Sequence, residues 1–118
     1  MNKVALVTGS TSGIGLAIAK SLAPKIQGLL LHGLATDEQV RRATEVVKAA
    51  NPSLSVEFHG ANLAVPEEIR NLVEFCKQKF HKTPDILVNN AGTLDVRTII
   101  ANDNNVNTFL QSLQSILP

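Results

Sequence analysis

The sequence predicts an α/β fold, in which a mostly parallel sheet is covered by helices. Short apolar runs alternate along the chain with segments whose apolar residues recur at helical spacing, which is typical of strand–helix–strand units. A glycine-rich turn also lies directly between the first apolar run and the first helical pattern. We therefore expect one domain over residues 1–118, a partial doubly wound sheet of about four strands with flanking helices.

Composition narrows the class of protein further. With 118 residues, of which 44% are hydrophobic, the chain can form one core. The net charge is +1 and no basic stripe occurs, so the sequence does not support a nucleic-acid partner. The longest apolar run, residues 26–34, is too short to span a bilayer, so we expect no membrane association. A first apolar run that begins at Val4 and a single cysteine lead us to expect a cytoplasmic protein.

The first part of the chain is expected to form two strands with a helix between them. Residues 4–8 and 29–31 are compact apolar runs, as expected of strands buried on both faces. Between them, five residues recur at helical spacing, and we expect their common face to pack against the sheet. These residues are Ile14, Ala17, Ile18, Ser21 and Leu22. Pro24 and Gly28 are expected to end this helix.

A second helix is expected to begin near Thr36. The oxygen-bearing side chain of this residue suits a helix start, and Asp37 and Glu38 would make the first turn acidic. Its inward stripe is expected to consist of Val40, Ala43, Thr44 and Val47. Asn51 and Pro52 are expected to end it.

The remaining elements follow the same alternation. Strands are expected at residues 54–58 and 86–88, and Pro66 suits the first position of the helix between them. The inward stripe of that helix is expected to consist of Ile69, Leu72, Val73, Cys76 and Phe80. A modest amphipathic helix is expected over residues 106–117. The fourth strand would be an apolar edge unless this helix or another chain covers it, and a homo- or hetero-oligomer could form there.

The strongest functional signal is the segment of residues 8–15, which reads T-G-S-T-S-G-I-G. Because glycine lacks a Cβ, it lets the backbone turn sharply, approach a pyrophosphate and pack the new helix against the strand. The free amides of the helix N-terminus would then face the phosphates. A plain glycine turn is the alternative, which the strand–turn–helix context disfavours. The candidate dinucleotide-binding residues are Gly9, Thr11, Ser12, Gly13, Ile14 and Gly15.

A second motif, N-N-A-G at residues 89–92, follows the fourth expected strand. Small residues at the carboxyl ends of strands line the crevice in which α/β sheets bind ligands. Alone this motif could be a turn, so its weight comes from its combination with the glycine turn.

The two motifs T-G-x-x-x-G-x-G and N-N-A-G, and their separation, resemble the short-chain dehydrogenase/reductase family over residues 3 to 92. The resemblance implies a Rossmann-like sheet, an NAD(P)-dependent oxidoreductase, and contacts from Asn90, Ala91 and Gly92 to the cofactor. The glycine turn is also similar to that of the 3-hydroxybutyrate dehydrogenase branch.

The family resemblance also points to the segment after the third strand. The family usually has an aspartate there that holds the adenine amino group, followed by a small or aliphatic residue. This chain has Asn62 and Leu63. The side-chain carbonyl of Asn62 can accept a hydrogen bond from adenine without charge assistance, so we expect weaker recognition.

Cofactor choice depends on the end of the second strand. An NAD site typically offers a carboxylate to the ribose 2′-hydroxyl, and an NADP site offers a cation. Gly33 or Leu34 stands at that position here, and Asp37 fits a helix cap better than a ribose partner. Because an unpaired 2′-phosphate would be costly to bury, we expect NAD to be favoured over NADP.

The family's catalytic residues are not found in these 118 residues. In the family a tyrosine transfers the proton, a lysine lowers the pKa of that tyrosine, and a serine orients the substrate. This chain contains no tyrosine, and no lysine follows Lys82. Asn107 has two interpretations, either the family's relay asparagine or an ordinary helix cap. We therefore expect no catalytic residue, and the spacing of the histidines and Cys76 predicts no metal site.

Three functional hypotheses remain at this point. In the first, the chain is the NAD(P)-binding part of an oxidoreductase, truncated and inactive alone. In the second, it is a non-catalytic dinucleotide-binding or regulatory module that pairs with a full-length relative. A degenerate fold without a ligand is the third hypothesis, and the two intact motifs disfavour it.

Overall fold

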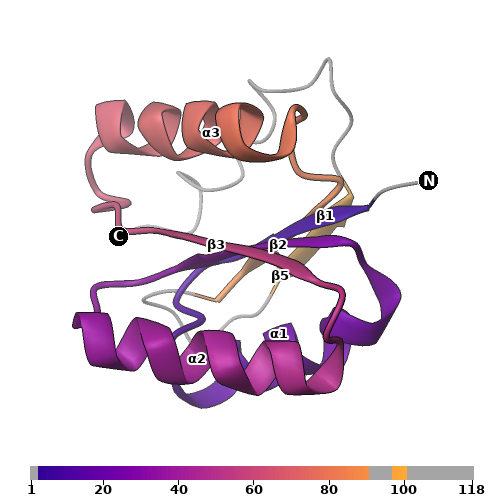
Figure 1. Ribbon diagram of the computed structural model, residues 1–118. Coiled ribbons are helices and arrows are strands. Elements are labelled where there is room, and N and C mark those ends of the chain that lie inside the picture. The colour runs from indigo at the N-terminus through magenta and orange to yellow at the C-terminus, as the bar shows by residue number, and fades with distance from the viewer. Residues whose placement is uncertain (1–2, 91–96, 101–118) are drawn as a thin grey trace.

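The fold is a five-stranded sheet with helices on both faces (Figure 1). The computed structural model describes residues 3–90 and, for the backbone alone, residues 97–100. The strands are β1 (Val4–Val7), β2 (Gly28–His32), β3 (Ser55–His59), β4 (Ile86–Asn89) and β5 (Arg97–Ile100), in the spatial order β3-β2-β1-β4-β5. The first four strands are mutually parallel, which confirms the predicted α/β, Rossmann-like architecture.

The expectation that β4 would be an open edge is wrong. β5 pairs with β4 in antiparallel orientation, with Leu87 opposite Ile99 and Val88 opposite Thr98. The pairing provides partners for backbone groups of β4 that would otherwise be exposed. No strong strand pattern follows Gly92 in the sequence, so β5 is not predicted from it.

In the described part of the chain, three α-helices cover the sheet, namely α1 (Gly13–Leu22), α2 (Asp37–Ala50) and α3 (Pro66–Phe80), and a short 3-10 helix, η1 (Ala23–Lys25), follows α1. Figure 1 shows α1 and α2 on one face and α3 on the other. Successive β1 residues point to opposite faces, so Leu6 packs in the core on the α3 side and Val7 in the core on the α1 and α2 side. Leu30 and Leu31 of β2 divide in the same way, which explains why these strands are apolar throughout.

The predicted inward face of α1 is correct only in part. Ile18 and Leu22 are half-buried and pack against the core, whereas Ile14 is 68% exposed. The fully buried residues of this helix are Gly15 and Ala19. The residues of the expected stripe also line a shallow depression together with Lys25. Because α1 is apolar on several sides, periodicity alone could not identify the inward face, and the close approach to the sheet selected the smallest residues. The helix ends at Leu22, and Gly28 begins β2 rather than ending α1.

The other two helices agree with the sequence pattern. Ala43 and Val47 of α2 are buried, and Val40 and Thr44 are half-buried. Ile69, Leu72, Val73 and Cys76 of α3 are buried, with Phe80 partly buried against them. Burial raises the pKa of the Cys76 thiol to about 12, which suits a core residue and not a nucleophile.

Two further sequence-based expectations concern the last helix and membrane association. The expected helix over residues 106–117 lies outside the described residues. Within the described part of the chain, no helix is long and apolar enough to cross a membrane.

Candidate functional site

The candidate site lies at the carboxyl ends of β1, β2 and β4. The chain leaves β1 toward α1 on one face, whereas α3, which leads into β4, lies on the other face. β1 lies between β2 and β4. The helix that follows β2 is α2, on the α1 face, and the helix that precedes β4 is α3, on the other face. The strand order therefore reverses at β1. In open α/β sheets this point forms the ligand-binding crevice.

The glycine turn between β1 and α1 requires its glycines for separate reasons. Gly9 and Gly13 have φ values of 60° and 58°, a region that other residues seldom adopt. A Cβ on Gly15 would lie 2.0 Å from the carbonyl oxygen of Gly9 and 2.6 Å from Nδ2 of Asn90. Gly15 therefore allows α1 to start against the backbone of the turn.

The N-terminus of α1 has no protein group that caps it among the described residues. Ser12 is the N-cap residue and has extended backbone angles, but its side chain makes no capping hydrogen bond. The first turn of the helix contains no acidic residue. The leading amides and the positive end of the helix dipole are thus available to an anion.

Asn90 holds the glycine turn in place. Its backbone N–H donates to Oγ1 of Thr8 at 2.9 Å, and its Nδ2 donates to the carbonyl oxygens of Thr8 at 3.3 Å and Gly9 at 3.1 Å. The asparagine of the second motif therefore braces the first motif. Ala91 and Gly92, which complete the motif, lie outside the described residues, as does Asn107.

His32, at the end of β2, is a structural member of the site that was not identified as one from the sequence. Its side chain is buried, with Nδ1 3.1 Å from the N–H of Gly9 and Nε2 2.9 Å from the carbonyl oxygen of Ala61. Burial lowers the pKa of His32 below its ordinary value; the hydrogen bond to Ala61 opposes this shift and the nearby charge of His59 adds to it. The one available signal was a lone polar side chain that ends an apolar strand beside the glycine motif.

The segment after β2, where the family resemblance predicts the ribose to lie, begins with two residues without charged side chains. Gly33 is packed so closely that a Cβ would lie 2.8 Å from Oγ1 of Thr11. Leu34, which follows, is 87% exposed. Asp37 is the first residue of α2 and is not its cap, because Thr36 takes that position.

The two residues expected after β3 have different environments. Asn62 is exposed, its Oδ1 accepts the N–H of Ala64 at 3.0 Å, and its own N–H donates to Glu68 at 2.8 Å. Leu63 is buried in the core under α3. Asn62 thus keeps an exposed amide, and the side chain of Leu63 supports the loop from below.

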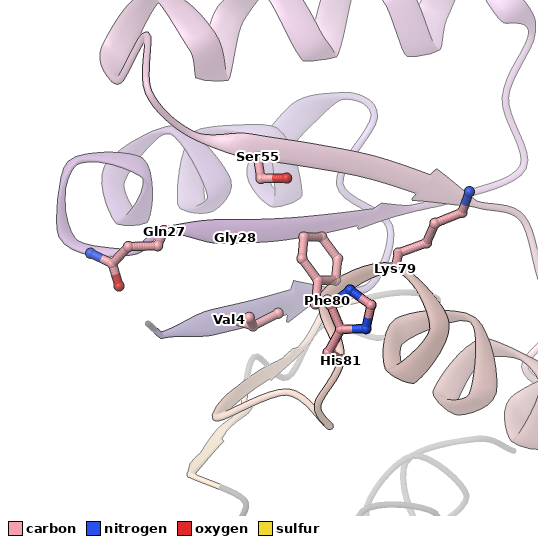
Figure 2. Close-up of a pocket in the computed structure, with 7 residues that line it drawn as sticks. All are labelled: Val4, Gln27, Gly28, Ser55, Lys79, Phe80 and His81. Carbon is pink, nitrogen blue, oxygen red and sulfur yellow. The ribbon is translucent and has the colours of Figure 1, made fainter. Parts of the chain in front are cut away.

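A separate pocket lies at the opposite end of the sheet (Figure 2). It has a volume of about 200 Å³ and is lined by Val4, Gln27, Gly28, Ser55, Lys79, Phe80 and His81. The ring of Phe80 packs against Gly28, where a Cβ would be 2.9 Å from the ring carbons. This pocket is at the amino ends of the strands and so belongs to the packing of α3, away from the crevice.

No group of three or more histidine, cysteine, aspartate or glutamate side chains in the described part of the chain is arranged to hold a metal ion. The glycine turn, the uncapped α1 and the position at the strand-order reversal together are features of a dinucleotide-binding α/β protein.

The family follows from comparison with known sequences. The family model described as short chain dehydrogenase matches residues 3–114. This chain therefore belongs to the short-chain dehydrogenase/reductase family, and the match continues beyond the region in which the motifs suggested it.

Individual relatives and solved structures agree with this assignment. The chain is 41% identical to a D-beta-hydroxybutyrate dehydrogenase of Rhizobium meliloti over 84% of this chain and 38% of that protein. It is 39% identical to a D-beta-hydroxybutyrate dehydrogenase of Cupriavidus necator over 82% of this chain and 36% of that protein. The structure of L-sorbose reductase from Gluconobacter frateurii, complexed with NADPH and L-sorbose, superimposes with a TM-score of 0.71 and 32% identity, over 95% of this chain and 46% of that one. The chain thus spans less than half the length of each of these relatives.

Proposed function

We propose that this chain is the NAD-binding part of an oxidoreductase of this family. The observation that carries the proposal is the uncapped N-terminus of α1, which begins at a glycine turn whose space a Cβ would fill. Such an N-terminus suits the pyrophosphate of a dinucleotide, because backbone amides and the helix dipole both favour negative charge there.

The proposed contacts extend from the turn into the crevice. Gly9, Gly13 and Gly15 would shape the phosphate cradle, and Thr11, Ser12 and Ile14 would border it. Leu34 would lie near the ribose, Asn62 and the backbone of Leu63 near the adenine, and Asn90, Ala91 and Gly92 beside the remaining part of the cofactor. These assignments rest on the position of the described residues at one edge of the sheet and on the family motifs.

NAD is proposed over NADP because the end of β2 offers no cation. Gly33 and Leu34 cannot pair with a 2′-phosphate, and the start of α2 presents acidic residues instead. The related L-sorbose reductase structure holds NADPH, so NADP is the alternative that the test below has to exclude.

Calorimetric titration of the chain with NAD and with NADP tests both parts of the proposal. We expect saturable NAD binding and at least tenfold weaker NADP binding. No binding of either dinucleotide to the folded chain would contradict the proposed function, and equal or tighter NADP binding would contradict the cofactor preference.

The reaction that this part serves is proposed to be oxidation of a 3-hydroxy acid, since two similar proteins are named D-beta-hydroxybutyrate dehydrogenases. The 118 residues contain no tyrosine, so the family's proton-transferring residue, which accepts the hydroxyl proton in this direction, would have to come from outside them. We expect no NADH absorbance when the chain alone is mixed with NAD and D-3-hydroxybutyrate. Robust turnover would show that another group accepts the proton.

A non-catalytic dinucleotide-binding or regulatory module is the second candidate function. An intact binding turn in a sequence without tyrosine favours it. Such a module would act in the cytoplasm and pair with a full-length relative, or with a second copy, through an edge of its sheet. Analytical ultracentrifugation of the chain, alone and mixed with a full-length relative, tests this candidate. Monomers under both conditions would contradict it.

A further inference from the structure

We propose that His32 is a positioning residue for the dinucleotide site, which acts by fixing the peptide of Gly9 through its Nδ1 atom. This inference rests on the proposed function, because its consequence is measured as dinucleotide affinity. His32 ends β2, one strand away from the glycine turn, and its side chain is 3% exposed. It therefore reaches the turn from within the protein and leaves the solvent side of the crevice free.

The partners of the imidazole define its chemical form. The carbonyl oxygen of Ala61 can only accept a hydrogen bond, so Nε2, 2.9 Å away, carries the ring proton. Nδ1 then has the lone pair that accepts the N–H of Gly9 at 3.1 Å. This assignment follows from the partners, and it requires a neutral ring with the proton on Nε2.

The same imidazole joins three segments that border the crevice. One nitrogen contacts the turn after β1, the other contacts the segment after β3, and the backbone of His32 belongs to β2. The carbonyl oxygen of His32 also accepts the N–H of Ser10 at 2.8 Å, and its N–H donates to Oγ of Ser10 at 3.0 Å. The backbone contacts would remain in any variant at this position, so the ring bonds can be tested separately.

The peptide groups on either side of Gly9 are held from two directions. His32 accepts its N–H, and Asn90 donates to its carbonyl oxygen at 3.1 Å. Glycine can adopt many backbone conformations, and Gly9 is held here at a φ of 60°. Because two opposed hydrogen bonds already restrict the turn, less conformational entropy is lost when a ligand binds. Fixing the turn before the ligand arrives raises affinity without any direct contact to the ligand.

The electrostatic surroundings favour the neutral ring. Burial lowers the pKa of His32, and His59 on the neighbouring strand is the titratable group that acts on it among the described residues. Burial lowers the pKa of His59 as well, while the carboxylate of Glu68 on α3 raises it. A protonated ring would place an N–H donor against the N–H of Gly9 and break the contact.

Two amide variants separate the ring's two hydrogen bonds. In His32→Asn, Oδ1 can take the place of Nδ1 and still accept from Gly9, whereas the bond to Ala61 is lost. In His32→Gln, the longer amide can donate to Ala61, whereas the bond to Gly9 is lost. Each variant loses one hydrogen bond, so each is the matched control of the other for general destabilisation.

The test is calorimetric NAD titration of the folded wild-type chain and the two variants, with folding checked by urea unfolding. We expect His32→Asn to bind NAD within threefold of wild type, and His32→Gln to bind at least tenfold more weakly. Equal affinities of the two folded variants would overturn the proposal. Absence of NAD binding to the wild-type chain would instead contradict the proposed function itself.

A second measurement needs no variant and remains decisive if a substitution prevents folding. Because coupling between two equilibria is reciprocal, bound NAD must slow hydrogen exchange at the Gly9 amide if the Gly9–His32 contact supports binding. We expect at least tenfold slower exchange at Gly9 in saturating NAD, and little change at Gln39, whose amide bonds to Thr36. Unchanged exchange at Gly9 in the NAD complex would overturn the proposal.

Discussion

The starts of α1 and α2 have the same position in the fold but opposite chemistry. At α2, Oγ1 of Thr36 accepts the N–H of Gln39 at 3.2 Å, and Oε1 of Gln39 accepts the N–H of Thr36 at 2.9 Å. Asp37 and Glu38 add negative charge to that first turn. At α1, Ser12 makes no side-chain cap and no acidic residue follows.

This difference indicates where an anion can bind. The capping box and the two carboxylates satisfy the amides and the dipole of α2 within the protein. The amides of α1 lack an internal partner of this kind in the described structure, and the adjacent glycine turn allows a ligand to approach closely. Two helices of the same layer thus have different uses, one structural and one proposed to hold phosphate.

The largest expected effect is that of Gly15→Ala, which removes the space on which the start of α1 depends. The new Cβ would lie 2.0 Å from the carbonyl oxygen of Gly9, so the turn must shift. We expect a loss of about 3 kcal/mol of unfolding free energy and no detectable NAD binding. Urea unfolding and calorimetry measure the two effects.

Gly13→Ala is the matched control for this substitution. Nothing lies within 4 Å of a Cβ at Gly13, and only its φ of 58° opposes a side chain. We expect a loss of about 1 kcal/mol. Equal losses for the two variants would contradict the close approach at Gly15.

Ser12→Asp would give α1 the kind of N-terminus that α2 has. The carboxylate is expected to cap the helix and stabilise the chain by about 0.5–1 kcal/mol, while repelling the phosphates and weakening NAD binding at least tenfold. Stability and affinity should therefore change in opposite directions. Unchanged NAD affinity in this variant would show that the phosphates lie elsewhere.

The sequence predicted those parts of the molecule in which one physical requirement dominated. The stripes of α2 and α3 were predictable because each of these helices has one apolar face, with buried residues such as Val47 and Leu72. The glycine turn was predictable because phosphate approach and helix packing both require residues without a Cβ. The inward face of α1 was predictable only in part, because Ile14 and Ala19 are both apolar and only the tertiary contact separates them.

Other features depended on contacts between distant residues. His32 lies 23 residues after Gly9 in the sequence, and a single polar residue at the end of a strand does not specify its partner. β5 was missed because a short edge strand has little pattern of its own. The absence of a charged side chain directly after β2 was apparent from the sequence, because Gly33 and Leu34 stand there. The structure adds that Gly33 packs closely against Thr11, which leaves no room for a side chain.

Thr36→Ala would open the N-terminus of α2 without creating a site there. The capping box would be lost, and we expect the unfolding free energy to fall by about 1 kcal/mol. NAD affinity should stay within twofold of the wild-type value, because Asp37 and Glu38 still repel phosphate. A gain of NAD affinity would contradict the distinction between the two helix starts.

His32, which holds the turn before α1, should make stability depend on pH, whereas the capping box of α2 should not. Burial lowers the pKa of His32, so the unfolded chain binds a proton there more readily than the folded chain. Stability should therefore decrease as the pH falls from 7.5 to 5.5, by up to about 1 kcal/mol for this residue. His32→Asn should reduce the slope, and Thr36→Ala should leave it unchanged. An unchanged slope in the His32 variant would contradict a buried neutral imidazole.

The most direct test of the central claim is an NMR titration of the ¹⁵N-labelled chain with NAD. The account predicts saturable shifts of the amides of Ser12, Gly13, Ile14 and Gly15, and little change at Asp37, Glu38 and Gln39. Largest shifts at the start of α2, or no shifts at the start of α1 in the folded chain, would contradict it.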